Sequence, residues 1–215
     1  MSRCCHPLKA CLVVLALLLL TPSCTTSDEQ GPLFQDDFSS QDGGWGVAQR
    51  DESERDYEQD KYFIESREPN WFAWAYPGLD FDDVSLEIDV YLDPDSPDGH
   101  YGVLCRHADE DNFYYFGVSA DGYYAIFRRM DGGALEVLTG DGTGMVPSPA
   151  INTGGDANHL LAVCRGDELS LYVNDELLET VTDDVHARGD VGLGAGSGPD
   201  GSFRVLFDDL AVAAP

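Results

Sequence analysis

The sequence predicts an all-β fold in which two antiparallel sheets pack as a sandwich. Three observations lead to this prediction: short runs of alternating apolar and polar residues, turn dipeptides between those runs, and no sustained 3.6-residue apolar period after the N-terminal segment. From residue 34 to residue 212 the pattern gives about a dozen strands in one domain, which indicates a sandwich or a jelly roll.

The clearest predicted strand covers residues 84–92. Its two faces differ, with Val84, Leu86, Ile88, Val90 and Leu92 on one and Ser85, Glu87, Asp89 and Tyr91 on the other. A period of two over nine residues is typical of a strand with one buried face.

Two hairpins follow from the turn dipeptides. The runs 113–119 and 123–128 flank Asp121-Gly122, and the runs 169–173 and 177–181 flank Asn174-Asp175. The glycine-rich run 192–198 precedes a Pro-Asp-Gly turn and no helix, so we interpret it as a tight crossing between sheets and not as a phosphate-binding loop.

The first residues have the pattern of an export signal. Arg3 and Lys9 precede an unbroken apolar run at 11–20, which is about half of what a membrane-spanning helix needs. Thr21-Pro-Ser before Cys24 resembles the lipobox of bacterial lipoproteins, whose Cys becomes the lipidated N-terminus. Ordinary secretory cleavage near Ser23 is the alternative.

We therefore predict a lipoprotein signal peptide at 1–23, lipidation at Cys24, a flexible tether at 24–33 and a folded domain at 34–215. The expected location is extracytoplasmic, at a bacterial cell membrane or cell surface, with membrane attachment through the lipid anchor.

The net charge of the chain excludes some classes of binding partner. The chain has 40 Asp and Glu against 12 Lys and Arg, a formal net charge of -28. This surface would repel phosphate backbones, so we expect no nucleic-acid partner. We expect a monomer whose carboxylates keep it soluble; cation binding is the alternative use of so many acids.

Cys105 and Cys164 are the two cysteines that remain beyond Cys24. In an oxidising compartment they are expected to form one disulfide, which would stabilise the fold by roughly 4 kcal/mol. Two buried free thiols are the alternative.

Several motifs together resemble the concanavalin A-like (laminin G-like) jelly rolls, and among them bacterial extracytoplasmic domains related to 3-keto-disaccharide hydrolase-type domains. The motifs are Asp36-Asp-Phe-Ser39, Gly44-Trp45, Asp111-Asn-Phe-Tyr114, Asp121-Gly-Tyr-Tyr124, Leu171-Tyr-Val-Asn174, Gly189-Asp-Val-Gly192 and Phe207-Asp-Asp-Leu210. The resemblance implies two antiparallel sheets, one of them concave, with the terminal strands side by side and glycan binding as the commonest use.

The segment 86–92 resembles the active strand of laminarinase-type β-glucanases, which carry Glu, Asp and Glu at alternate positions. Here Glu87 and Asp89 match the first two, but Tyr91 occupies the third. Without the acid/base carboxylate, retaining hydrolysis lacks one of its two groups, so we predict no catalytic residues.

Candidate glycan-binding residues come from aromatic side chains and from strand parity. The run 71–76 alternates Trp71, Ala73 and Ala75 with Phe72, Trp74 and Tyr76, so one face is bulky and would be either core or a stacking platform for sugars. Parity places Tyr91, Arg106, Tyr115 and Arg128 away from the expected core. The candidate glycan-binding residues are these four together with Trp74, Glu87 and Asp89.

Asp93, Asp95 and Asp98 lie close together in a Pro/Gly-rich turn. Clustered carboxylates suit structural calcium, although the spacing is not that of an EF-hand loop and a solvated turn is the alternative. No other cofactor is expected.

These observations predict an exported, non-catalytic domain that binds an extracellular polysaccharide or a surface protein. Two alternatives stay open: a glycoside-processing enzyme of the 3-keto-disaccharide hydrolase or β-glucanase kind, and a structural lipoprotein of the cell envelope.

Overall fold

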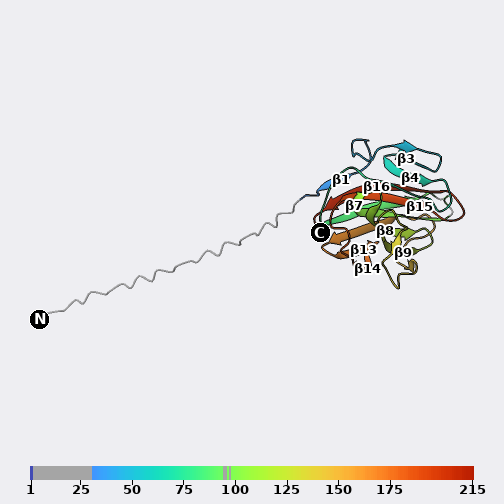
Figure 1. The fold of residues 1–215 in the computed structure, drawn as a ribbon. Coiled ribbons are helices and arrows are strands. Elements are labelled where there is room, and N and C mark those ends of the chain that lie inside the picture. Colours follow the sequence, from blue (N-terminus) through green and yellow to red (C-terminus); the bar gives the residue numbers. More distant parts are fainter. Residues whose placement is uncertain (2–30, 94–95, 97) are drawn as a thin grey trace. The chain divides into compact units, whose positions relative to one another are not determined.

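The computed structural model describes Met1 and residues 31–93, 96 and 98–215 (Figure 1). This part of the chain contains sixteen β-strands and no helix, and therefore no helix long and apolar enough to cross a membrane. The predicted signal peptide at 1–23 (apart from Met1), Cys24 and most of the tether at 24–33 lie outside the described residues and stay predictions.

One sheet has nine strands in the order β14-β13-β12-β6-β16-β4-β3-β2, with β1 paired to the C-terminal part of β16. Its members are β1 (Phe34–Asp36), β2 (Ala48–Gln49), β3 (Ser53–Glu58), β4 (Lys61–Ser66), β6 (Val84–Leu92), β12 (Asn158–Arg165), β13 (Glu168–Val173), β14 (Glu176–Thr182) and β16 (Phe203–Ala213).

The second sheet has seven strands in the order β10-β9-β8-β7-β15-β5, with β11 paired to β9. Its members are β5 (Phe72–Ala75), β7 (Gly99–Asp109), β8 (Asn112–Ser119), β9 (Tyr123–Arg129), β10 (Glu136–Val137), β11 (Val146–Pro147) and β15 (Asp190–Ser197).

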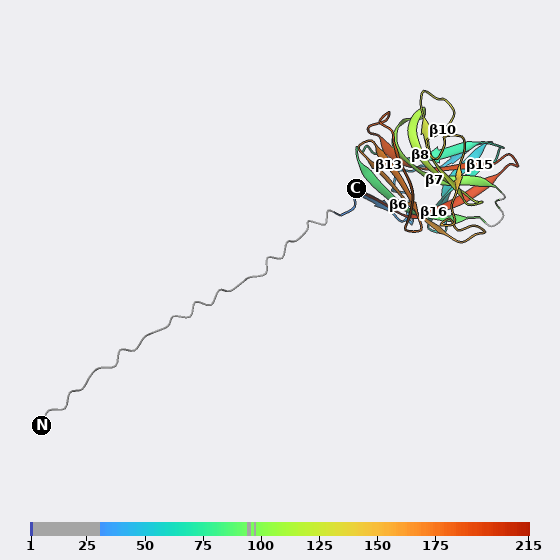
Figure 2. The same ribbon diagram turned by 90° about the horizontal axis from the view of Figure 1, so that it is seen from below.

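The two sheets form a sandwich, seen from two directions in Figure 1 and Figure 2. Its core takes side chains from both inner faces: Ile88 and Phe207 come from the nine-stranded sheet, and Val103 and Phe116 from the seven-stranded sheet. All four are fully buried. The predicted all-β sandwich is therefore confirmed.

The predicted strand at 84–92 is β6, with the same bounds. Val84, Leu86, Ile88 and Val90 are buried as the alternation predicts, and Glu87 is exposed on the other face. The count of sixteen exceeds about a dozen because four members, β1, β2, β10 and β11, are only two or three residues long.

Both predicted hairpins form. Asn174 and Asp175 between β13 and β14 have φ values of 51° and 68°, the left-handed pair that a two-residue hairpin turn requires. Between β8 and β9 only Gly122 has positive φ, at 94°, because that loop has three residues.

The two ends of the domain meet in the nine-stranded sheet. Phe34 of β1 pairs with Val212 of β16, and Asp36 pairs with Leu210. The Asp36 carboxylate accepts hydrogen bonds from the Trp45 indole, at 3.0 Å, and from the backbone of Phe38, at 2.8 Å. The terminal strands thus lie side by side, as the resemblance implies.

The interpretation of the glycine-rich run as a crossing between sheets was wrong. Residues 190–197 form β15, which lies between β7 and β5 in the seven-stranded sheet. Its glycines are needed on one face, because rings from neighbouring strands lie over them as described below.

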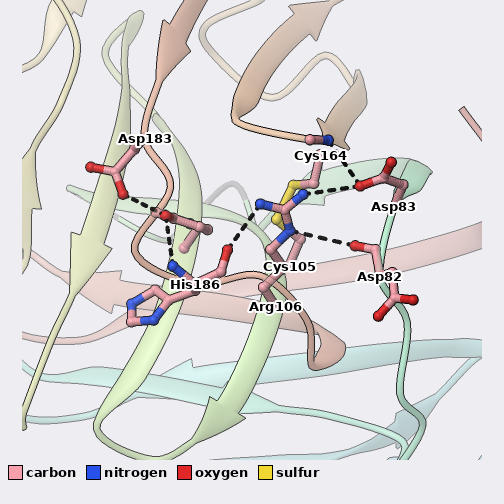
Figure 3. Close-up of a disulfide and its surroundings, with 9 residues drawn as sticks. Asp82, Asp83, Cys105, Arg106, Cys164, Asp183 and His186 are labelled. Carbon is pink, nitrogen blue, oxygen red and sulfur yellow. Dashed lines mark hydrogen bonds and ion pairs between the residues drawn. A yellow bond between two sulfur atoms is a disulfide. The ribbon is translucent and has the colours of Figure 1, made fainter.

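A disulfide joins Cys105 of β7 to Cys164 of β12 (Figure 3). The two strands belong to different sheets, so the bond ties the sandwich across its core. Both cysteines are fully buried. The structure thus forms the pair that the cysteine count predicts.

Replacing both cysteines, Cys105→Ala with Cys164→Ala, is expected to lower the free energy of unfolding by about 4 kcal/mol, since the bridge closes a loop of 59 residues. Urea titration of both proteins measures the difference. Native wild-type protein, unfolded without reductant, should show no thiol that reacts with an alkylating agent; two reactive thiols would contradict the prediction.

Candidate functional site

The alternation predicted for residues 71–76 occurs in β5, the edge strand of the seven-stranded sheet. Ala73 and Ala75 contact the main core between the sheets. Phe72 and Trp74 point to the opposite, outer face, where both are partly exposed. The bulky face therefore points away from the core between the sheets and packs against a second cluster on the outer face.

A row of glycines crosses the middle of this outer face. Gly117 of β8 pairs with Gly102 of β7, which pairs with Gly194 of β15, and Gly194 pairs with Trp74 of β5. A Cβ at Gly194 would lie 3.0 Å from the Tyr115 ring. A Cβ at Gly117 would meet the Tyr115 and Phe127 rings, whereas one at Gly102 would meet the backbone of Phe116. The missing side chains at Gly117 and Gly194 therefore make room for aromatic rings.

Those rings form a second, smaller cluster, which we call the aromatic layer: Phe72, Trp74, Phe113, Tyr115 and Phe127. The ring centroids of Phe72 and Tyr115 are 4.8 Å apart, and those of Trp74 and Phe113 are 5.5 Å apart. Tilted and offset contacts at such distances are favourable for aromatic pairs. The layer covers the outer face of the seven-stranded sheet and ends in partly exposed rings at β5.

Tyr115 connects this layer to His100. Its hydroxyl lies 2.9 Å from the His100 Nδ1 atom. Burial raises the pKa of Tyr115 well above its usual value and lowers the pKa of His100 to about 4. Both groups are therefore neutral at pH 7, and the pair acts as a hydrogen bond within the layer.

At the other end of the layer, Trp74 contacts polar groups on both sides. Its indole nitrogen donates to the Nε2 atom of His107, at 3.2 Å, and the Arg129 guanidinium lies 5.4 Å from its ring centroid. Tyr76 stacks on His107 with the ring centroids 4.3 Å apart. His107 and Arg129 thus contact Trp74 directly, and Tyr76 packs against His107.

A cleft of about 190 Å³ runs beside the edge strand β5, and we call it the β5 cleft. One wall is aromatic and the other comes from β2 and β3. The lining residues are Ala48, Arg50, Ser53, Glu54, Arg55, Trp71, Phe72, Ala73, Trp74, Tyr76 and Glu110.

Arg55 holds the two walls of the β5 cleft together. Its guanidinium donates a hydrogen bond to the backbone carbonyl of Trp74, which lies on the unpaired edge of β5. Trp71, at the mouth of the cleft, is 40% exposed. The cleft therefore combines an accessible indole with guanidinium and hydroxyl donors, the groups that contact a sugar ring.

A shallower recess of about 360 Å³ lies near the opposite edge of the aromatic layer. Ser119, Tyr123 and Met145 line it together with His100, and the carboxylates of Asp98 and Asp121 stand at its rim. This recess is more open than the β5 cleft, and none of the described residues that line it is a lysine or an arginine.

Three of the seven predicted glycan-binding residues lie on the nine-stranded sheet instead. Glu87, Asp89 and Tyr91 face outward from β6. Asp89 lies 2.7 Å from His159 Nδ1, and the Lys61 ammonium lies 4.5 Å from the centroid of the Tyr91 ring. They cannot contact a ligand that is held at the aromatic layer.

Arg106 has a structural role, in contrast to its predicted exposure. It is 2% exposed, and its guanidinium donates to the backbone of His186 at 2.9 Å and to Asp83 at 3.2 Å (Figure 3). The parity argument fails because the β7–β8 register shifts after Cys105, where Arg106 takes a φ of 51°.

Arg128 also holds elements together. It pairs with Asp183 at 2.5 Å and with Glu136 at 2.6 Å. The hydrogen bond to Glu136, together with the negative charges of both carboxylates, raises the pKa of Arg128. Of the seven candidates, only Trp74 and Tyr115 share the outer face of the seven-stranded sheet, and Tyr115 is fully buried in the layer.

The calcium hypothesis for Asp93, Asp95 and Asp98 stays a prediction. Asp95 lies outside the described residues, and Asp93 lies 3.8 Å from the Arg204 guanidinium. Within the described residues no three His, Cys, Asp or Glu side chains gather in a way that could hold a metal ion.

Sequence reasoning missed His100 and the two arginines of the β5 cleft. Phe72 was visible in the alternation of residues 71–76. For Arg50 and Arg55 no sequence signal exists, because their approach to Trp74 depends on how the edges of the two sheets meet.

Comparisons with known proteins support the fold. No family model matches the chain, and no curated protein matches it in sequence. Among solved structures, the carbohydrate-binding module CBM66 from Bacillus subtilis matches with a TM-score of 0.59 and 19% identity, over 79% of this chain and 91% of that one. The Bacillus licheniformis β-glucanase matches with 0.60 and 9%, over 87% and 100%.

The catalytic domain of an endo-1,3-β-glucanase (laminarinase) from Thermotoga petrophila RKU-1 matches with a TM-score of 0.57 and 11% identity, over 84% of this chain and 96% of that one. The chain therefore has the concanavalin A/galectin-like jelly-roll fold that carbohydrate-binding modules and glycoside hydrolases share. At these identities the likeness concerns the fold alone.

The low pKa of His100, a partly buried residue, predicts a loss of stability in mild acid. Its pKa of about 4 in the folded protein lies below the 6.5 of the unfolded chain, so the unfolded state takes up a proton first as the pH falls. His100 should therefore cost about 2 kcal/mol of unfolding free energy between pH 7 and pH 5.

Urea titration at both pH values tests this, with His100→Asn as the comparison, since an amide keeps a partner for the Tyr115 hydroxyl. The variant should lose less stability than the wild type over this interval. Equal losses in the two proteins would contradict the assignment.

Proposed function

We propose that the protein is an exported, non-catalytic module that binds extracellular polysaccharide at the β5 cleft. The observation that carries this proposal is the partly exposed aromatic wall of Trp71, Phe72 and Trp74 beside the guanidinium groups of the cleft. Sugar rings bury their C–H faces on indole rings, while charged donors bond their hydroxyls.

The jelly-roll fold supports the proposal without deciding between binding and catalysis. The carboxylates on β6 favour binding. Glu87 and Asp89 lie on the face of the sandwich opposite to the aromatic layer, and Tyr91 stands at the third position of that strand. Retaining hydrolysis uses a second carboxyl group as its acid and base, and the Tyr91 phenol is not such a group.

Trp71→Ala is expected to weaken polysaccharide binding by about tenfold, because it removes an exposed indole that a sugar would cover. Isothermal titration with polysaccharides chosen from a glycan array measures the change. Tyr91→Ala is the matched control: it removes an aromatic ring from the opposite face and should leave the affinity within about twofold.

Reducing-sugar release from laminarin or lichenan, tested on the same samples, should be absent. Release that Glu87→Gln abolishes would overturn the proposal in favour of a β-glucanase. If no glycan binds and an envelope protein co-purifies instead, the structural lipoprotein is the better account.

The anchoring part of the proposal rests on Cys24. Two or more acyl chains, at about 0.8 kcal/mol per buried methylene, hold a protein stably on a bilayer. Cys24→Ala is expected to move the protein from the membrane fraction to the soluble exported fraction. Intact mass of the wild-type protein is the direct check: an unmodified mature N-terminus would contradict lipidation.

A further inference from the structure

The charges of this protein single out two arginines. With 40 acidic and 12 basic residues, almost every cation finds a carboxylate. The described residues hold ten Lys and Arg side chains, the twelve less Arg3 and Lys9. Eight form ion pairs: Lys61, Arg67, Arg106, Arg128, Arg129, Arg165, Arg188 and Arg204. Within the described residues the two that form none are Arg50 and Arg55.

Both of these arginines line the β5 cleft. Only part of the hydrogen-bonding capacity of Arg55 is used. Its guanidinium donates a hydrogen bond to the Trp74 carbonyl, while its buried Nε–H has no hydrogen-bond partner within the described residues. A buried donor that lacks a partner is unfavourable.

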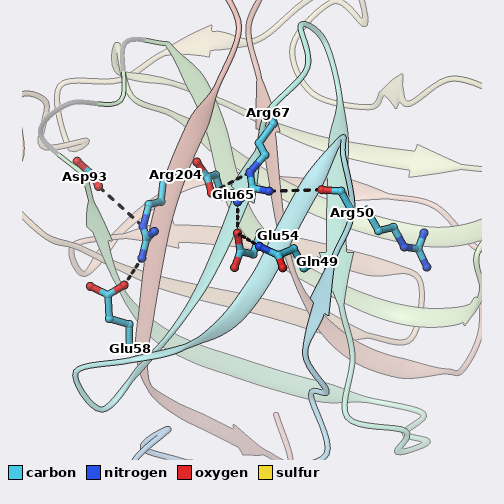
Figure 4. A network of polar contacts seen from close by, with 8 residues as sticks. All are labelled: Gln49, Arg50, Glu54, Glu58, Glu65, Arg67, Asp93 and Arg204. Atoms are coloured by element: carbon cyan, nitrogen blue, oxygen red, sulfur yellow. Dashed lines mark hydrogen bonds and ion pairs between the residues drawn. The ribbon is translucent and has the colours of Figure 1, made fainter.

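Arg50 is exposed at the rim of the same cleft. Its backbone carbonyl accepts a hydrogen bond from Arg67 at 3.4 Å, which fixes the chain at this point. Its guanidinium extends away from the neighbouring Arg67–Glu54–Glu65 network (Figure 4).

The carboxylates around the cleft do not neutralise these two cations. Glu54 is engaged by Arg67, and the other acid of the lining, Glu110, is exposed in the turn between β7 and β8 and forms no ion pair within the described residues. In a protein with a net charge of -28, two guanidinium groups left without an anion mark a local site for one.

We propose that the β5 cleft binds an anionic sugar unit of a polysaccharide, with its carboxylate or sulfate group on Arg50 and Arg55 and its ring on Trp71. This inference rests on the proposed function and names its ligand class. A planar guanidinium matches the two oxygens of such a group with two parallel hydrogen bonds. The exposed indole beside it supplies the stacking surface.

The test titrates the wild-type protein with three probes: polygalacturonate, which carries carboxylates, dextran sulfate, which carries sulfates, and dextran, which carries neither. Arg50→Gln should weaken binding of the polyanion by about tenfold, the effect of losing one charge-assisted contact. Arg50→Lys should recover part of the loss, because it keeps the charge without the fork.

Arg165→Gln is the matched control, since it removes the same charge from an exposed arginine on β12, in the other sheet. It should leave the affinity within about twofold. If Arg50→Gln and Arg165→Gln weaken binding equally, the effect comes from net charge and the inference fails. Arg55 is not the first choice for mutation, because it also holds β5.

The probes separate the remaining outcomes. Binding of polygalacturonate or of dextran sulfate, lost in Arg50→Gln, supports the inference and identifies the anionic group. Binding of neutral dextran with no effect of Arg50 overturns it but leaves polysaccharide binding standing. Binding of no probe and of no glycan on an array overturns the inference and the proposed function together.

Discussion

The seven-stranded sheet is buried on both faces, and the candidate site depends on this constraint. Antiparallel sheets commonly pack one face on a core and leave the other to water. Here the glycines at 117 and 194 leave out side chains that would stand on the outer face, and rings of the aromatic layer take their place. The partly exposed ends of that layer, Phe72 and Trp74, are held by rings beneath them instead of by a loop. A rigid platform of this kind loses little conformational entropy when a ligand binds.

The same constraint explains what the sequence could and could not predict. The alternation predicted both ends of β6 correctly, because the outer face of this strand is in contact with solvent. The alternation failed at Tyr115. It correctly places this residue outside the core between the sheets, but the ring is fully buried in the aromatic layer. An alternation with a period of two residues shows on which face of a strand a side chain lies, but it cannot show that a second layer of side chains covers that face. The run of glycines at 192–198 was one trace of that layer, but without knowledge of its partner strands it resembles a turn.

The cysteine pair was predictable for a different reason: with two cysteines left in the domain, only one bridge within it is possible. The role of Arg106, the residue after Cys105, could not be predicted. A bulge is a local change in pairing that no alternation contains, and it turns this guanidinium under the segment at 82–83 and toward His186. The cleft likewise lies between the edges of two sheets and depends on tertiary packing alone.

Ion pairs in this acidic chain also act on strand pairing. Glu54 and Glu65 stand directly opposite each other on β3 and β4, a pairing of like charges that destabilises a sheet. Arg67 contacts both, and Arg204 does the same for Glu58 and Asp93 further along (Figure 4). Arg67 thus lies where repulsion between carboxylates would otherwise weaken the pairing of β3 with β4.

The position of β16 has a consequence for how the domain folds. It is the last of the described strands along the chain, yet it pairs with β6 on one side and with β4 and β1 on the other. Until residues 203–213 are available, the nine-stranded sheet consists of two separate halves with unpaired edges. Folding of this sheet must therefore wait for residues 203–213 and close contacts of very long sequence separation, which is intrinsically slow. Until then two unpaired strand edges, on β6 and on β4, are open to pairing with other chains.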